Sequence, residues 1–165
     1  MFKFLRKRKE KYGVPIYISE PTIIYHTQTE RAILKIIEER LNSNNFILPS
    51  EYGLKPTQHM IKDAHIFIAI GIVGKFTSLV VREIKTAQEL RKKIYTLNVA
   101  RKGEEIYYDF FEGIPEDIEW LNEGETNKLY EDFRGEEFSG FCLLYTSDAA
   151  DEGLGVDLGG RRIIK

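Results

Sequence analysis

The feature that most constrains this 165-residue chain is an apolar run, HIFIAIGIV, at residues 65–73. Its length and its β-branched residues favour a strand covered on both faces, because a half-exposed strand alternates with polar residues. The run is far shorter than the roughly 20 residues that span a bilayer. It therefore predicts the central strand of a sheet with helices on both sides, and no membrane span.

Short strands and amphipathic helices alternate around this run. In the first long helix, Thr27 is followed three positions later by Glu30, which is a capping-box pattern. Such alternation predicts right-handed crossovers and an α/β fold. We expect a flavodoxin-like (Rossmann-like) parallel sheet of four to five strands, in the order 2-1-3-4(-5), with helices on both faces. The other expected strands are 13–19, 45–50 and 94–99, and the expected helices are 27–44, 55–64 and 77–93.

The chain after residue 99 is less regular. Residues 105–113 have the composition of a fifth strand, but the five residues ARKGE before them are too few for a crossover helix. Two alternatives therefore stay open for residues 105–113, an antiparallel strand and a loop. Residues 115–124 and 125–137 are expected to form helices, the first with Pro115 at its start.

Length favours one domain, and the single cysteine fits a reducing compartment. The net charge is only −2, yet residues 1–12 form a basic arm. Such an arm contacts phosphates or an anionic membrane surface, or is simply solvated, and we favour the solvated interpretation. We find no clear pattern for nucleic-acid binding. A single cysteine and the lack of an N-terminal signal pattern predict a cytoplasmic protein.

The last 24 residues differ in composition from the rest of the chain. Residues 142–165 are rich in Gly, Asp, Ala and Leu, without lasting periodicity. Their strings CLLYTSDAADE and VDLGGRRII resemble, in order, the two constant parts of a sequencing-library adapter translated in frame. We interpret 142–165 as a non-native, disordered tail from the assembly of environmental DNA. On this interpretation, residues 13–141 are the single native domain, and the native chain beyond Phe141 is missing.

Glu83 is the most informative polar residue within an apolar helical stripe. Ligands of an open parallel sheet bind beyond the carboxyl ends of its strands, where helices begin. Glu83 lies in the second turn of helix 77–93, near this edge. Spacing alone favours an ordinary residue at the boundary of the stripe. The three histidines lack the spacing that places two of them on one helical face, so no metal site is expected.

Three segments of the chain resemble prokaryotic TIR-like (Thoeris-like) domains. They are IYIS at 16–19, MIKDAHIFIAIG at 60–71 and TSLVVREIKTAQELRKKIYTLNV at 77–99. In the last segment, Thr77 stands for the serine of the family pattern and Glu83 matches its glutamate. The chain departs from the pattern where Leu79 replaces a tryptophan and where Glu20 and Pro21 follow the first strand.

The resemblance implies a nucleotide-binding TIR-like domain in antiphage or stress signalling. In enzymatic members of the family, the glutamate at the position of Glu83 is catalytic for cleaving the nicotinamide–ribose bond of NAD. Cleavage develops positive charge on the ribose, which an ionised carboxylate stabilises. Glu83 is thus the candidate catalytic residue, and NAD is a candidate substrate rather than a cofactor. The expected substrate-binding residues are Ser19, Pro21, Gly71, Thr77 and Ser78.

Two alternatives stay open. The wider fold group includes nucleoside 2-deoxyribosyltransferases, in which a glutamate on the corresponding helix is the nucleophile. The second alternative is a TIR-like module without catalysis, which acts through self-association or contacts with partner proteins.

Overall fold

The computed structural model describes residues 10–52, 56–102, 104–134 and 162–164. Its strands are β1 (Ile16–Ser19), β2 (Phe46–Ile47), β3 (Ile66–Ile72), β4 (Lys75–Phe76), β5 (Lys93–Lys102), β6 (Glu105–Glu112), β7 (Glu119–Trp120) and β8 (Arg162–Ile164). The α-helices are α1 (Gln28–Leu41), α2 (Gln58–Asp63), α3 (Ser78–Glu89) and α4 (Glu123–Arg134). Two short 3-10 helices are η1 (Thr22–Ile24) and η2 (Pro49–Glu51).

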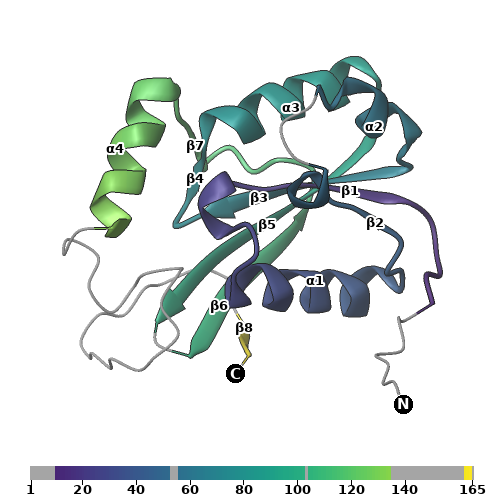
Figure 1. Cartoon of the computed structure of the whole chain (residues 1–165), viewed down its shortest axis with the longest axis horizontal. Helices are drawn as coiled ribbons and strands as arrows, with labels where there is room; N and C mark the ends of the chain where they lie inside the picture. The colour runs from purple at the N-terminus through teal and green to yellow at the C-terminus, as the bar shows by residue number, and fades with distance from the viewer. Residues whose placement is uncertain (1–9, 53–55, 103, 135–161, 165) are drawn as a thin grey trace, which may run out of the picture.

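The first half of the chain builds the parallel part of the sheet. β1 pairs in parallel with β2 on one side and with β3 on the other, and β3 pairs in parallel with β5. Figure 1 shows α1 on one face of the sheet, and α2 and α3 on the other. The predicted α/β class, with a mostly parallel sheet between helices, is therefore confirmed.

The predicted number of strands is too low. Within the described residues, eight strands form one sheet, in which β2-β1-β3-β5-β6-β8 run side by side and β4 and β7 extend from β3. β6 begins three residues after the end of β5 and pairs with it antiparallel. A connection this short does not allow a parallel crossover. Of the two alternatives for residues 105–113, the antiparallel strand is thus the one that forms.

The two ends of the chain lie largely outside the described residues. Of the predicted basic arm, only residues 10–12 are described, and the backbone N–H of Tyr12 donates to Asn44 Oδ1 at 2.6 Å. Of the predicted disordered tail, only β8 is described, and it pairs antiparallel with β6. The other residues of the predicted tail lie outside the described residues, and the interpretation of 142–165 as non-native stays a prediction.

Each face of the sheet carries its own hydrophobic core. One cluster joins α1 and α4 to the sheet, and its buried members include Ile18, Ile37, Ile70 and Phe133. The other joins α2 and α3 to the opposite face, and its buried members include Tyr17, Ile61, Phe67 and Ile84. Side chains alternate along β1 between the two clusters, because successive residues of a strand point to opposite faces.

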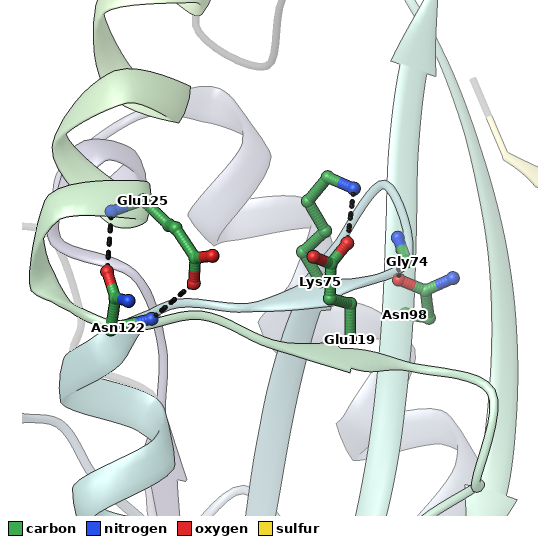
Figure 2. A network of polar contacts seen from close by, with 6 residues as sticks. All are labelled: Gly74, Lys75, Asn98, Glu119, Asn122 and Glu125. Atoms are coloured by element: carbon green, nitrogen blue, oxygen red, sulfur yellow. Dashed lines mark hydrogen bonds and ion pairs between the residues drawn. The ribbon is translucent and has the colours of Figure 1, made fainter.

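A tight turn after β3 adds two strands that the sequence patterns did not predict. Val73 and Gly74 both have positive φ, at 51° and 79°, so the chain reverses and β4 pairs antiparallel with β3. Figure 2 shows Asn98 accepting a hydrogen bond from the Gly74 N–H at 2.9 Å. It also shows the 3.0 Å ion pair between Lys75 of β4 and Glu119 of β7, where the two strands run parallel.

A capping box sets the start of α4. The N–H of Glu125 donates to Asn122 Oδ1 at 2.8 Å, and the N–H of Asn122 donates to Glu125 Oε1 at 2.9 Å (Figure 2). α4 therefore begins at Glu123. The prediction of a helix over residues 115–124 is wrong, because this stretch contains β7 and the cap.

Candidate functional site

Glu83 lies inside the buried face of α3. Val80, Ile84 and Ala87 of this helix are fully buried, and Glu83 itself is 4% exposed. Residues three and four positions apart share one face of a helix, so Glu83 lies over Val80 and beneath Ala87. Its side chain thus enters the layer between α3 and the sheet, rather than lying at the boundary of the apolar stripe.

Three hydroxyl groups donate hydrogen bonds to the Glu83 carboxylate. Ser19 Oγ lies 2.7 Å from Oε1, while Thr57 Oγ1 and Tyr17 OH lie 2.9 and 3.0 Å from Oε2. Tyr17 and Ser19 come from the end of β1, and Thr57 directly precedes α2. No ion pair to Glu83 is found among the described side chains, so its described hydrogen bonds come from hydroxyl groups. The charge of Arg82 adds a smaller stabilisation of the ionised form and lowers the pKa of Glu83 slightly.

Burial and hydrogen bonding act in opposite directions on Glu83. Burial raises the pKa of Glu83, whereas the hydrogen bonds from Ser19, Thr57 and Tyr17 limit the increase. Burial also raises the pKa of Tyr17, and the charge of Glu83 adds to this effect. Tyr17 therefore keeps its proton and serves as a donor to the carboxylate.

A second buried carboxyl group lies at the same end of β1. Glu20 directly follows β1 and is fully buried, yet no described N–H or O–H group donates to either of its oxygens. Burial raises the pKa of Glu20 to about 10, and the nearby carboxylates of Glu30 and Glu83 add to the increase. Glu20 is therefore a neutral carboxylic acid at neutral pH.

Glu30, in the first turn of α1, is the acidic neighbour of Glu20. Its Oε2 accepts from Ser50 Oγ at 2.8 Å, and its Oε1 accepts from the His26 N–H at 2.9 Å. Burial raises the pKa of Glu30, but the neighbouring Glu20 and the hydrogen bonds from Ser50 and from the His26 N–H outweigh it and hold the pKa below the ordinary value. Burial thus has opposite net outcomes for the two neighbouring glutamates.

The remaining predicted residues occupy varied places around this edge of the sheet. Pro21 is buried directly after Glu20, at the start of η1. Thr77 is fully buried at the N-cap of α3, and its hydroxyl has no partner among the described groups. The Ser78 N–H donates to Thr126 Oγ1 of α4 at 2.9 Å. The structure thus joins Ser19 to Glu83 directly, while Ser78 is engaged by α4.

Gly71 is a close-packed residue of β3. A Cβ atom at this position would lie 3.1 Å from Asn98 Oδ1 and 3.4 Å from the Phe76 ring. The lack of a side chain at Gly71 thus serves the packing of β3 against β5 and β4. None of the described hydrogen bonds links Gly71 to Glu83.

Four further site residues were not predicted from the sequence: Tyr17, Glu20, Glu30 and Thr57. Alternation along a strand puts Tyr17 on the same face as Ser19, so this residue had a signal in the sequence. Thr57 had none, because its contact with Glu83 depends on how α2 packs against α3. Glu20 was noted only as a departure from the TIR-like pattern, and Glu30 only as part of a capping box.

Other kinds of site are not found in the described part of the chain. No group of three His, Cys, Asp or Glu side chains there has the arrangement to hold a metal ion. None of the described helices has both the length and the apolar character needed to cross a bilayer. Two cavities that described residues line lie beside α4 and along α1, away from Glu83.

Comparison with known proteins adds no family assignment. No family model matches the sequence, and no curated protein matches it significantly.

Proposed function

We propose that this protein binds a nucleotide at the carboxyl end of β1 and β3 and cleaves its N-glycosidic bond with Glu83. The observation that carries the proposal is the Glu83 carboxylate, which is buried and receives hydrogen bonds from Ser19, Thr57 and Tyr17. Burying a glutamate costs free energy of folding. A buried glutamate whose oxygens accept hydrogen bonds, at the edge of the sheet where ligands bind, therefore indicates a catalytic or binding role.

The arrangement of strands supports the place of the site. The order β2-β1-β3-β5 agrees with a flavodoxin-like sheet, in which ligands bind where the strand order reverses, between β1 and β3. Ser19 ends β1 at this point, and its hydroxyl contacts Glu83. The proposed substrate therefore meets the carboxylate beyond the end of β1.

The chemistry of the bond requires a carboxylate of this kind. When an N-glycosidic bond breaks, positive charge develops on the ribose ring, and a fixed negative charge beside it lowers the barrier. The three hydroxyl donors hold Glu83 in one orientation and favour its ionised form. NAD is the first substrate to test, because the TIR-like resemblance implies it.

Nucleoside 2-deoxyribosyl transfer is the second candidate function. It uses a glutamate as a nucleophile that bonds to the sugar, and such a nucleophile has to be held in one orientation. The contacts from Tyr17 and Ser19 on β1 and from Thr57 before α2 fix Glu83 from two sides. This geometry suits covalent attack as well as charge stabilisation.

The test is product release by the full chain. The protein is incubated separately with NAD and with a set of deoxynucleosides, and free nicotinamide or free base is measured by chromatography. We expect release from at least one substrate and its loss in Glu83→Gln. Glu89→Gln, an exposed glutamate on the same helix, is the matched control and keeps full activity.

A different outcome would favour a module without catalysis. If no substrate is cleaved, and light scattering shows self-association that Glu83→Gln leaves intact, the enzymatic proposal fails. Glu83 would then be a structural residue that ties β1 and α2 to α3.

A further inference from the structure

The outer edge of β6 is covered by another strand over only part of its length. On the inner side, all eight residues of β6 pair with β5. On the outer side, β8 pairs with Ile106, Tyr107 and Tyr108, and no described strand lies beside residues 110–112. An edge strand presents backbone N–H and C=O groups to any extended segment that reaches it. This edge can therefore pair with a strand longer than β8.

The strand that covers part of this edge belongs to the segment that we interpret as non-native. β8 lies within residues 142–165 and pairs antiparallel with β6. Backbone groups make the hydrogen bonds of such a pair, so pairing does not require one particular sequence. In the sequence, the two isoleucines of β8 lie between Arg161, Arg162 and Lys165. β8 is thus an example of the segment that suits this edge, a short apolar run with basic residues around it.

The charge of the β6 edge explains why basic residues suit it. Residues 104–112, EEIYYDFFE, contain four acidic residues and no basic one. Glu104 and Glu112 are exposed, Glu105 is partly exposed, and Glu112 forms an ion pair with Lys93 of β5. The β6 strand of a second copy is a poor partner, because antiparallel pairing about the middle of β6 places Glu105 opposite Glu112. Like charges directly opposite each other destabilise a strand pair.

The N-terminal arm is a segment of the required composition. Residues 1–9, MFKFLRKRK, contain five basic residues and no acidic one. Phe2 and Phe4 lie on either side of Lys3, an alternation that is typical of a strand with one covered face. The charge of the arm is opposite to that of the β6 edge, so the arm is the better candidate for a partner strand.

The arm joins the described chain at the other edge of the sheet. Asn44, which lies two residues before β2, binds this junction through two hydrogen bonds. Its Nδ2 donates to the Glu10 carbonyl at 3.1 Å, and its Oδ1 accepts from the Tyr12 N–H at 2.6 Å. β2 and β6 lie four strand positions apart in the order β2-β1-β3-β5-β6, with α1 over the face between them (Figure 1). The arm therefore starts far from the β6 edge of its own copy.

The length of the arm favours the β6 edge of a second copy. Four strand spacings amount to about 19 Å. Nine extended residues span at most about 30 Å, so an arm that crosses its own sheet keeps only about three residues for pairing. The arm of a neighbouring copy does not have to cross a sheet and keeps its full length.

We propose that the N-terminal arm of one copy of this protein adds as a strand to the β6 edge of a second copy. Backbone hydrogen bonds provide the pairing, and the basic residues of the arm opposite the acidic residues of β6 make it selective. The contact runs head to tail, from the β2 side of one copy to the β6 side of the next, so copies form a ring or an open chain. It does not involve Glu83 and is independent of the function proposed above.

The decisive experiment exchanges the charges of the two surfaces in the full chain. The arm variant carries Lys3→Glu, Arg6→Glu and Lys7→Glu, and the edge variant carries Glu104→Lys and Glu105→Lys. In analytical ultracentrifugation we expect the unaltered protein to associate as its concentration rises. Each variant alone is expected to raise the dissociation constant at least about tenfold, because like charges then meet. An equal mixture of the two variants is expected to associate again, because each arm then meets an edge of opposite charge.

A matched control reverses three charges away from the β6 edge. Lys35→Glu, Lys62→Glu and Lys85→Glu together alter exposed lysines of α1, α2 and α3, and we expect this variant to associate like the unaltered protein. Association that persists in the arm variant would point to another surface between copies and overturn the inference. A mixture of arm and edge variants that stays monomeric would overturn it as well.

A further variant covers the case in which β8 keeps the edge occupied. Ile163→Pro removes a backbone N–H from the middle of β8 and so weakens its pairing with β6 at Tyr107. We expect this variant to shift towards larger species than the unaltered protein at the same concentration. If the unaltered protein is monomeric, the charge exchange is repeated with Ile163→Pro in every variant, and monomers throughout would overturn the inference.

Discussion

The two faces of the sheet bury a glutamate at the same end of β1, but they treat the carboxyl group differently. On the α3 face, Glu83 is 4% exposed and receives three hydroxyl hydrogen bonds. On the α1 face, Glu20 is fully buried and receives none from the described groups. Burial is therefore nearly equal, and the donors around each group make the ionised form more favourable for Glu83 than for Glu20.

This difference shows why burial alone is a poor guide to the role of a glutamate. Each carboxyl group loses its water, and this loss favours the neutral form in both. Only around Glu83 do Ser19, Thr57 and Tyr17 replace the water. The same edge of the sheet thus holds two buried glutamates whose ionised forms are stabilised to different degrees.

The largest expected effect comes from removing the charge of Glu83. We expect Glu83→Gln to lower the rate of N-glycosidic cleavage by about 1,000-fold or more, because the amide neither bonds to the sugar nor stabilises its charge. Steady-state kinetics of base release measure this effect. A residual rate within tenfold of the unaltered protein would show that Glu83 does not act in the reaction.

The second effect concerns stability, and it has the opposite sign from most substitutions of buried residues. Folded Glu20 keeps its proton up to a pKa of about 10, while the unfolded chain loses it near 4.5. Between these values the folded state binds the extra proton, so stability falls as pH rises. Glu20→Gln removes this loss, and we expect a gain of at most roughly 6 kcal/mol at pH 9 and almost none at pH 4.

Urea unfolding of Glu20→Gln and of the unaltered protein at several pH values measures this difference in the free energy of unfolding. Glu30→Gln is the control variant, because its pH dependence is expected to have the opposite sign. The pKa of Glu30 is lowered in the folded state, so its contribution is present at neutral pH and is lost as pH falls through the folded pKa. Glu30→Gln is therefore expected to destabilise the protein at pH 7. If the free energy of unfolding of the unaltered protein and of Glu20→Gln changed with pH in parallel, the raised pKa of Glu20 would be contradicted.

The third effect tests the donors themselves. Ser19→Ala removes the shortest hydrogen bond to Glu83, at 2.7 Å, and we expect a loss of about 1.5–3 kcal/mol at pH 7. Ser50→Ala removes a comparable bond to Glu30, at 2.8 Å, but Ser50 is partly exposed and water can replace it. Its loss is expected to be smaller, at about 0.5–1 kcal/mol. Equal losses in urea unfolding would show that the two faces do not differ in this way.

The smallest effect applies the same principle to a hydroxyl group. The buried Thr77 hydroxyl has no described partner, so Thr77→Val removes an unsatisfied polar group and is expected to change stability by no more than about 1 kcal/mol, towards greater stability. Thr126→Val is the control, because it removes the acceptor of the Ser78 N–H and is expected to destabilise by about 1–2 kcal/mol. A marked loss of stability in Thr77→Val would reveal a partner for this hydroxyl.

Sequence patterns predicted the first half of the fold well and the second half poorly. The apolar run at 65–73 became β3, and Thr27 became the N-cap of α1, where its side chain accepts from the Glu30 N–H. After residue 99, the predicted helix at 115–124 gave way to β7 and a capping box. The pattern of Asn122 followed by Glu125 was present in the sequence and indicates the start of α4 correctly.

The candidate site was predicted in part. The TIR-like resemblance indicated Glu83, whereas helical spacing alone favoured an ordinary residue there. The end of the first strand indicated Ser19, which the structure joins to Glu83. Thr57 and Glu20 were missed, for different reasons. The contact of Thr57 joins positions 26 residues apart in the chain, and the lack of donors around Glu20 depends on everything that packs near it.

The sequence by itself determined the local elements and their order, because periodicity, caps and turn residues act within a few positions of each other. It placed Glu83 at the boundary of the apolar stripe of a helix, and the structure buries this residue within the stripe. Only the tertiary structure decided which buried glutamate receives hydrogen-bond donors. That outcome depends on hydroxyl groups from β1 and from before α2 that surround Glu83 but not Glu20, and long-range packing alone brings them there.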